Sequence, residues 1–171
     1  MRSSAASDVY KRQGYKRRCQ MEESIKDNLT SDIWDVLGLK SVSPRQLSPL
    51  VLAYIGDSIF DLVVKTKIVT AGNTQVNKMN RAASSIVKAE SQSKMIGYLE
   101  DKLTEEEGSV YKRGRNAKSY TSAKNASISD YRRATGFEAL MGYLYLSGQY
   151  ERMCELIKDA LDWLENDNKQ A

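Results

Sequence analysis

Two carboxylates in this sequence lie in surroundings that are otherwise apolar. Asp57 interrupts the segment AYIGDSIFDL, and Glu138 is the single charged residue of ATGFEALMGYLYLSGQY. A carboxylate in such a segment is costly to bury unless it is paired or bound to a cation. For Asp57 the plain alternative is a solvated side chain near an ion pair between Asp61 and Lys65. For Glu138 the alternative is a position on a narrow solvent-exposed face of its helix or a pairing with a lysine.

A glycine stands shortly before each acid, Gly56 before Asp57 and Gly136 before Glu138. Glycine lets two backbones approach closely. Two carboxylates that are brought together repel each other unless a cation lies between them, and oxygen ligands select Mg²⁺ or Mn²⁺. Such an ion can activate water and stabilise charge on a phosphodiester. We therefore expect the two acids to share one metal site between two helices.

The segment 109–133 concentrates positive charge next to Glu138, because it holds seven basic residues against the single acid Asp130. Lysine, arginine and asparagine side chains suit contacts with the phosphate oxygens of a nucleic acid. The candidate phosphate-binding residues are Lys112, Arg113, Arg115, Asn116, Lys118, Lys124, Arg132 and Arg133. The plain alternative is a solvated loop. The position beside Glu138 favours a phosphate-backbone footprint.

The composition excludes several kinds of chemistry. The 171 residues contain no histidine, which removes Ser-His and Cys-His nucleophiles and histidine-bound metals. Cys19 and Cys154 are the only cysteines, too few for a cysteine zinc site and in keeping with a reducing cytoplasm. No apolar run approaches the roughly 20 residues that a membrane span needs. We expect a cytoplasmic protein that does not contact a membrane.

The first twenty residues, MRSSAASDVYKRQGYKRRCQ, lack helical or strand periodicity and look like translated adapter sequence. The alternative is a disordered basic tail. Without this segment, 1–20, the remaining residues, 21–171, hold 20 basic and 21 acidic side chains. Bulk charge is therefore no argument for nucleic-acid binding, and only the local pattern counts. The length predicts a single domain over 21–171.

Apolar periodicity predicts an all-α fold. Ser48 with Pro49 begins a helix, Thr104 with Glu107 forms a capping box, and Ser129 can cap a long helix. We expect helices over 24–37, 48–69, from 76 onward with or without a break before 95, from 104 toward 112, from 129 to 148 and over 149–165. The composition of residues 114–128 predicts a loop.

Three segments resemble a known family. LSPLVLAYIGDSIFDL, YKRGRNAKSYTSAKNA and YRRATGFEALMGYLYLSG are similar to the sequence blocks of Mini-ribonuclease III, small bacterial relatives of ribonuclease III without its separate double-stranded-RNA-binding domain. The resemblance covers residues 21 to about 166. It implies an all-α ribonuclease III endonuclease-domain helical bundle that works as a homodimer. It also implies Mg²⁺-dependent cleavage of double-stranded RNA, with Mn²⁺ as a substitute, leaving 5′-phosphate and 3′-hydroxyl ends.

The resemblance assigns the catalytic and metal-binding roles to Asp57 and Glu138. The broader ribonuclease III pattern adds an acid four residues before the Asp and one three residues before the Glu, where this chain has Ala53 and Thr135. The number of metal ions in each site, one or two, is therefore left open by the sequence. The implied substrate is the precursor of 23S ribosomal RNA in the large ribosomal subunit, with or without a ribosomal-protein helper.

Two other interpretations of the sequence stay open beside the enzyme. One is a catalytically inactive helical RNA-binding or ribosome-associated module. The other is a helical interaction bundle whose basic segment is merely solvated. A ribonuclease III domain that has lost its activity usually lacks the acids, and this chain keeps both, which favours the enzyme.

Overall fold

The computed structural model describes residues 33–118 and 127–170, which divide into two units at Val42 and Ser43. In the first unit, residues 33–36 are helical. The helix ends at Gly38, which has a φ of 60°, and the Leu39 amide donates to the Trp34 carbonyl at 2.9 Å. The end expected at Gly38 is confirmed. The earlier part of that helix and the segment 1–20 lie outside the described residues.

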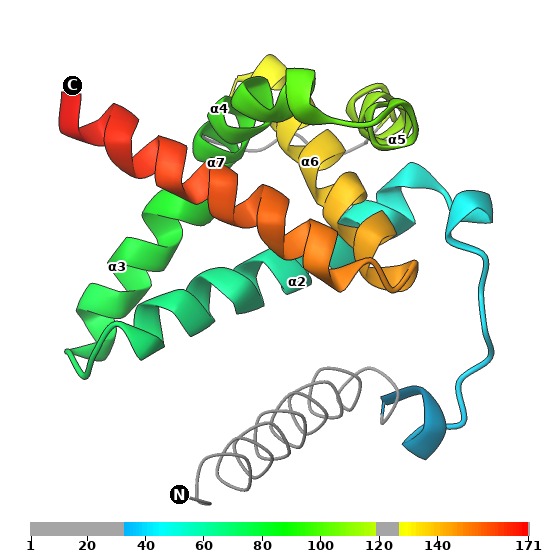
Figure 1. Cartoon of the computed structure of the whole chain (residues 1–171), viewed down its shortest axis with the longest axis horizontal. Coiled ribbons are helices and arrows are strands. Elements are labelled where there is room, and N and C mark those ends of the chain that lie inside the picture. Colours follow the sequence, from blue (N-terminus) through cyan, green and yellow to red (C-terminus); the bar gives the residue numbers. More distant parts are fainter. Residues whose placement is uncertain (1–32, 119–126, 171) are drawn as a thin grey trace, which may run out of the picture. The chain divides into compact units, whose positions relative to one another are not determined.

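The described part of the second unit consists of helices and their connections, without a strand (Figure 1). Its elements are η1 (Pro44–Gln46), α2 (Pro49–Thr70), α3 (Val76–Val87), α4 (Ala89–Leu99), η2 (Glu100–Lys102), α5 (Glu105–Arg115), α6 (Ile128–Leu146) and α7 (Tyr150–Gln170). The expected all-α fold is confirmed. Among the described residues, no helix combines the length and the apolar character needed to cross a membrane.

Local capping decides where several helices begin. Ser48 Oγ accepts from the Val51 amide at 3.3 Å, and the expected capping box of Thr104 and Glu107 is present. The cap expected at Ser129 is wrong, because α6 is capped by Ser127 and begins at Ile128. Ser127 Oγ accepts from the Asp130 amide at 3.0 Å and donates to the Asp130 carboxylate at 2.6 Å. Ser129 has an arginine at the corresponding third position, so it could not form this reciprocal pair.

Other boundaries differ from expectation by about one turn. The helix that begins at Val76 breaks at Lys88, whose ψ of 149° separates α3 from α4. Helix α5 continues beyond Lys112 to Arg115, and α7 continues to Gln170. Three basic side chains in the last turn of α5 oppose the negative end of the helix dipole and favour this extension. The expected loop over 114–128 is therefore too long at both ends.

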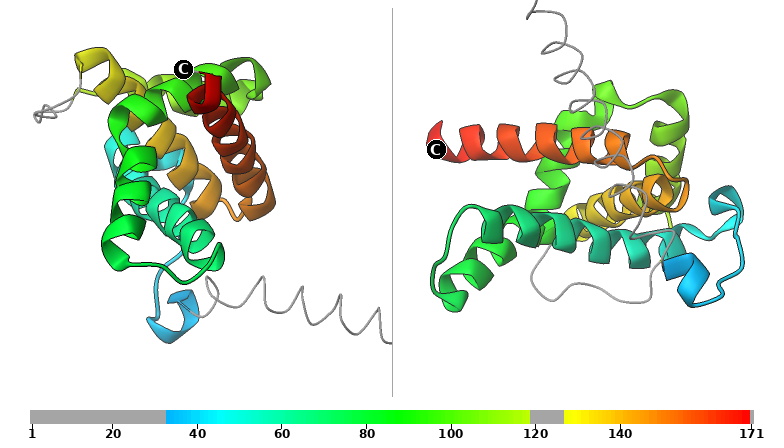
Figure 2. Two further views of the ribbon diagram at one scale, coloured as in Figure 1. Left: turned by 90° about the vertical axis from the view of Figure 1, so that its left-hand side faces the viewer. Right: turned by 60° about the horizontal axis from the view of Figure 1, so that its bottom comes forward.

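Helix α6 is the centre of the second unit, in contact with α2, α4, α5 and α7, and Figure 2 shows these helices around it. Most of its side chains are buried, as expected for a helix that is apolar on nearly all sides. Phe137 of α6 meets Phe60 of α2 edge to face, with ring centroids 5.0 Å apart. The apolar face expected for the last helix is buried as well. The position of α6 is thus held by packing on several sides.

Candidate active site

Two glycines bring α2 and α6 into backbone contact. A Cβ atom added to Gly56 would lie 1.8 Å from the Glu138 carbonyl oxygen, and one added to Gly142 would lie 2.0 Å from the Leu52 carbonyl oxygen. Neither position has room for a side chain, so the helices cross at a distance that only glycine permits. Since Asp57 follows Gly56, the crossing brings the Asp57 segment against the Glu138 segment.

The expectation that Gly136, like Gly56, lets the two acid-bearing helices approach each other is wrong. Gly136 faces α5, where an added Cβ would lie 2.6 Å from Cδ2 of Tyr111. Gly114 of α5 packs against α6 in return. A residue two positions from Glu138 points to a different side of the helix, whereas Gly142, four positions on, shares its face. The second glycine of the α2–α6 crossing is therefore Gly142.

The two acids influence each other electrostatically. Burial, followed by the charge of Asp57, raises the pKa of Glu138 to about 8, and the Gln92 side chain partly opposes this rise. Asp57 is exposed on one side, but folding still removes part of its hydration. This loss of hydration, followed by the charge of Asp61, raises the pKa of Asp57 as well. Asp61 itself pairs with Lys65 at 2.6 Å. Among the causes of both pKa shifts, no basic side chain offsets the repulsion between the two carboxylates.

This pair suits a hard divalent cation. A cation would relieve both the repulsion and the burial cost that raise the pKa of Glu138. In the described residues no group of three or more His, Cys, Asp or Glu side chains could hold a metal. Ala53 and Thr135 add no carboxylate, and the Thr135 hydroxyl donates to the Tyr131 carbonyl at 3.0 Å. The donor set is therefore two carboxylates.

Four of the predicted phosphate-binding residues line one cavity of about 570 Å³: Arg115, Asn116, Arg132 and Arg133. The first residues of α6 and Glu100 complete its lining. Arg133 Nη2 lies 3.4 Å from the Glu100 carboxylate, and its buried Nε has no hydrogen-bond partner among the described residues. Three guanidinium groups against one carboxylate leave the cavity positively charged.

The other predicted basic residues do not join this cavity. Lys112 and Arg113 line a neighbouring cavity of about 590 Å³ with Asn116. Arg113 Nη2 donates to the Leu47 carbonyl at 3.1 Å, which ties α5 to the segment before α2. Lys118 is exposed just after α5, and Lys124 lies outside the described residues.

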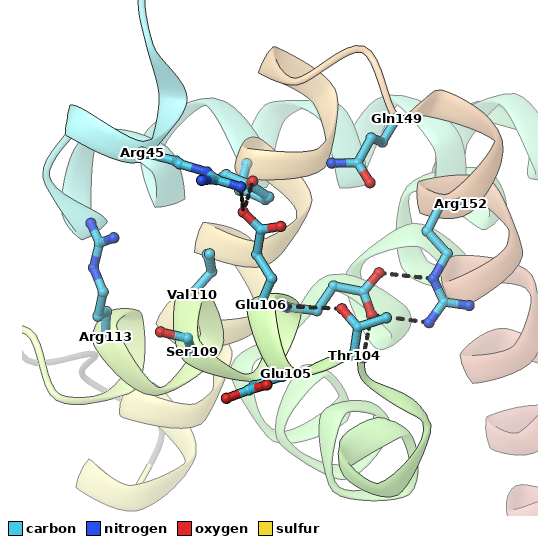
Figure 3. A pocket seen from close by; sticks show the side chains of 11 residues that line it. Arg45, Thr104, Glu105, Glu106, Ser109, Val110, Arg113, Gln149 and Arg152 are labelled. Atoms are coloured by element: carbon cyan, nitrogen blue, oxygen red, sulfur yellow. Dashed lines mark hydrogen bonds and ion pairs between the residues drawn. The ribbon is translucent and has the colours of Figure 1, made fainter.

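A third cavity, of about 890 Å³, is lined by residues of η1, α5, α6 and α7 and includes Arg113 (Figure 3). Arg45 and Glu106 point toward each other there at 2.6 Å, and Arg152 reaches Glu107 at 2.8 Å. These ion pairs join elements that are distant in the sequence. Neither predicted acid lines this cavity, so we assign it a structural role.

Gln92 of α4 was not predicted; it is 1% exposed, donates to the Val87 carbonyl at 2.9 Å and lowers the pKa of Glu138. A signal for it exists in the sequence. Gln92 lies three residues before Met95 and four before Ile96, so it stands on the apolar stripe of its helix. A polar residue at such a position is a candidate for a specific buried contact.

Comparison with known proteins defines the class. The Ribonuclease III domain profile matches residues 50–149, more than half of the chain. A crystal structure of a protein from Fusobacterium nucleatum superposes with a TM-score of 0.63 at 27% identity, covering 69% of this chain and 94% of that one. The fold and the match together define a ribonuclease III domain.

Individual relatives identify the family within this class. The Mini-ribonuclease 3 of Clostridium tetani is 48% identical over 73% of this chain and 83% of its own length. That of Brevibacillus brevis is 46% identical over 73% of this chain and 93% of its own, and that of Enterococcus faecalis 49% identical over 66% and 87%. The chain belongs to the Mini-ribonuclease III family and is an endoribonuclease.

Proposed function

We propose that this protein cuts double-stranded RNA with the help of Mg²⁺, or Mn²⁺ in its place, and that Asp57 and Glu138 hold the ion. The main observation in support is that burial and the charge of Asp57 together raise the pKa of Glu138 to about 8. Such a pair gains from a bound cation, which offsets the burial and the repulsion. The ion would supply Lewis-acid chemistry at the scissile phosphodiester.

Basic residues near the pair would position the RNA. Arg115, Arg132 and Arg133 line a positively charged cavity beside the helix that also carries Glu138. Guanidinium groups bind phosphate oxygens without reading the base sequence. Duplex RNA is recognised mainly by shape, phosphates and 2′-hydroxyl groups. In this proposal the cavity holds the backbone while the two acids act at the bond that is cut.

The cleavage test uses two conservative substitutions, Asp57→Asn and Glu138→Gln. Each removes a charge and keeps the shape, so we expect loss of duplex cleavage in Mg²⁺ while binding of the duplex without metal persists. Asp159→Asn is the control, because it changes a carboxylate that pairs with Lys102 on the protein surface. Normal turnover by either site variant would reject the assignment. Duplex that is bound but left intact by the unaltered protein would favour the RNA-binding module.

A homodimer is part of the proposal. Helix α2 buries Leu52, Phe60 and Val64 on one side, yet several large apolar side chains remain exposed. Val51, Tyr54, Leu62 and Val69 are 49%, 81%, 51% and 60% exposed. Their spacing places them on one stripe opposite the buried side. A second copy of this chain would cover that stripe.

The family resemblance suggests a biological substrate. By analogy with its family, we propose that this enzyme matures the precursor of 23S ribosomal RNA in the cytoplasm. The test is the length of that RNA in cells depleted of the protein. Extended ends that shorten when the purified enzyme is added would support this substrate, and mature ends would contradict it.

A further inference from the structure

The carboxylate of Glu100 connects a buried tyrosine to the positively charged cavity. Glu100 Oε1 accepts a hydrogen bond from the Tyr111 hydroxyl at 3.0 Å and lies 3.4 Å from Arg133 Nη2. Tyr111 is 1% exposed, whereas the side chains of Arg133 and Glu100 are 34% and 43% exposed. Burial, followed by the hydrogen bond to Glu100, raises the pKa of Tyr111, so its hydroxyl stays protonated and remains a donor. A side chain fixed in the core therefore holds a carboxylate that lines the cavity.

The ring of Tyr111 packs against α6. A Cβ atom added to Gly136 would lie 2.6 Å from Cδ2 of Tyr111, so the ring lies directly on the α6 backbone. The Cζ of Arg115 lies 5.7 Å from the centroid of the same ring, within the range of a cation–π contact. Tyr111 thus contacts Arg115 directly and Arg133 through Glu100, and both arginines line the cavity.

Gly97 of α4 leaves room for the Arg133 guanidinium. A Cβ atom added to Gly97 would lie 2.5 Å from Arg133 Nη2, so a side chain there would displace the guanidinium from the surface of α4. The contact with Gly97 and the ion pair with Glu100 limit the orientations that Arg133 can adopt. An arginine that is held before binding loses less conformational entropy when it binds a phosphate.

We propose that Tyr111 is a positioning residue for RNA binding: its hydroxyl fixes Glu100, and Glu100 together with Gly97 holds the Arg133 guanidinium ready for a phosphate of the duplex. This inference rests on the proposed function of the cavity. The separation of 3.4 Å between Glu100 and Arg133 is longer than a charge-assisted hydrogen bond of about 2.7–2.9 Å. Glu100 therefore orients the guanidinium without forming a tight pair that would compete with a phosphate.

The experiment replaces Tyr111 by Phe, which removes the hydroxyl and keeps the ring against Gly136. Glu100 is partly exposed, so water can hydrate the carboxylate that loses its donor, and the variant should fold. The Kd for duplex RNA is measured without metal, and kcat and KM are measured in Mg²⁺. We expect Kd and KM to rise about two- to tenfold, which corresponds to the loss of one hydrogen bond. The value of kcat should not change.

Tyr143→Phe is the matched control. Tyr143 is 4% exposed, and its hydroxyl donates to Glu106, which also pairs with an arginine, Arg45, at 2.6 Å. The two tyrosines therefore have the same kind of partner, but Glu106 lines the cavity to which we assign a structural role. Both phenylalanine variants should lower the melting temperature, and only Tyr111→Phe should weaken RNA binding.

Gly97→Ala tests the placement of Arg133 without loss of stability. Alanine is the better helix former, so the melting temperature should not fall. The added Cβ displaces the guanidinium, which lies at the end of a flexible side chain, so the Kd for duplex RNA should rise. An unchanged Kd in this variant would overturn the proposed placement.

A double variant shows whether Tyr111 acts through Arg133. Arg133→Gln alone should weaken RNA binding, and the addition of Tyr111→Phe should weaken it no further. Additive effects would overturn the proposal, as would an equal rise of Kd in Tyr143→Phe or a Tyr111→Phe variant that does not fold. A Kd that rises in Arg133→Gln but not in Tyr111→Phe refutes the positioning alone. If neither substitution changes Kd, the proposed function of the cavity is wrong and the positioning is refuted with it.

Discussion

The carboxyl group of Glu138 carries the sharpest chemical signature in the described part of the chain. Its pKa lies at about 8 in the folded protein because of burial and the neighbouring Asp57. In the unfolded chain a glutamic acid titrates near pH 4.3. The folded protein therefore binds this proton more tightly than the unfolded chain does. Its contribution to stability is intact below the unfolded pKa and is lost as the pH rises toward 8.

The difference between the pKa of Glu138 in the folded protein and in the unfolded chain predicts how the stability of the metal-free protein depends on pH. In EDTA, the free energy of unfolding should fall between pH 5 and pH 8, by an amount on the order of a few kcal/mol. Urea unfolding at pH 5, 6.5 and 8 measures the fall. Glu138→Gln should flatten it, because glutamine does not titrate. The same slope in both proteins would show that other groups cause the dependence.

Carboxylates whose pKa values are lowered do not interfere in this range. Arg152 holds the pKa of Glu107 below its usual value, and Ser127 does the same for Asp130. A lowered pKa contributes stability that is lost only as the pH falls toward the acid range. Adding Mn²⁺ at pH 8 should restore stability to the unaltered protein and leave Glu138→Gln unaffected.

The sequence predicted that Asp57 and Glu138 lie close enough to interact, and the effect of Asp57 on the pKa of Glu138 agrees with this. Asp57 and Glu138 could be found because a charge in an apolar segment needs an explanation. The role of Gly136 was misjudged, because a glycine indicates a close approach without identifying the helix that approaches. Gln92 was missed because the contacts of α4 with α3 and α6 form only in the fold.

The close crossing of α2 and α6 at Gly56 positions the two acids, so a side chain at Gly56 should disturb both the fold and the site. Gly56→Ala would place a Cβ 1.8 Å from a carbonyl oxygen, so the helices must separate. We expect a loss of about 1–3 kcal/mol or more in unfolding free energy, together with loss of cleavage. Urea unfolding and a cleavage assay measure the two effects.

Gly108→Ala is the control for the crossing. Gly108 also lies within a helix, α5, but an added Cβ there would meet nothing within 4 Å. Alanine should stabilise this position by about 0.5–1 kcal/mol, because glycine is the poorer helix former. Equal effects of the two substitutions would contradict the proposed role of the crossing.

Helix positions were largely predictable, since caps and apolar periodicity are local. Ser48, Thr104 and the apolar face of α7 were found from neighbouring residues alone. The start of α6 was misplaced because two serines compete, and the choice depends on a side chain three residues further on. The extension of α5 has a local cause in the basic side chains of its last turn and a non-local one in the packing of Gly114 against α6, and only the first could be read from the sequence.

The positively charged cavity predicts how RNA binding depends on salt. Arg132→Gln removes one of the three guanidinium groups that line it. The slope of log K against log salt concentration should become shallower by about one for each phosphate that is no longer neutralised. Arg113→Gln is the comparison, because that side chain bonds to the Leu47 carbonyl and lines other cavities. An equal change in slope for both variants would show that the cavity has no special role in binding RNA.

The exposed apolar stripe of α2 predicts a homodimer. Leu62→Glu places a charge on a side chain that is already 51% exposed, so the isolated fold should tolerate it. We expect the variant to sediment as a monomer at micromolar concentration, while the unaltered protein sediments as a dimer. A dimer that survives this change, and also Tyr54→Glu, would place the interface elsewhere.

The backbone contact at Gly56 also has a consequence for redesign. Because main-chain atoms of α2 and α6 touch, the spacing of the two acids is built into the bundle and does not depend on a flexible lid. Attempts to change the RNA affinity of this nuclease should therefore leave the glycines untouched and vary the arginines around the positively charged cavity. Libraries confined to those arginines would vary how tightly a duplex is held at little risk to the proposed catalytic pair.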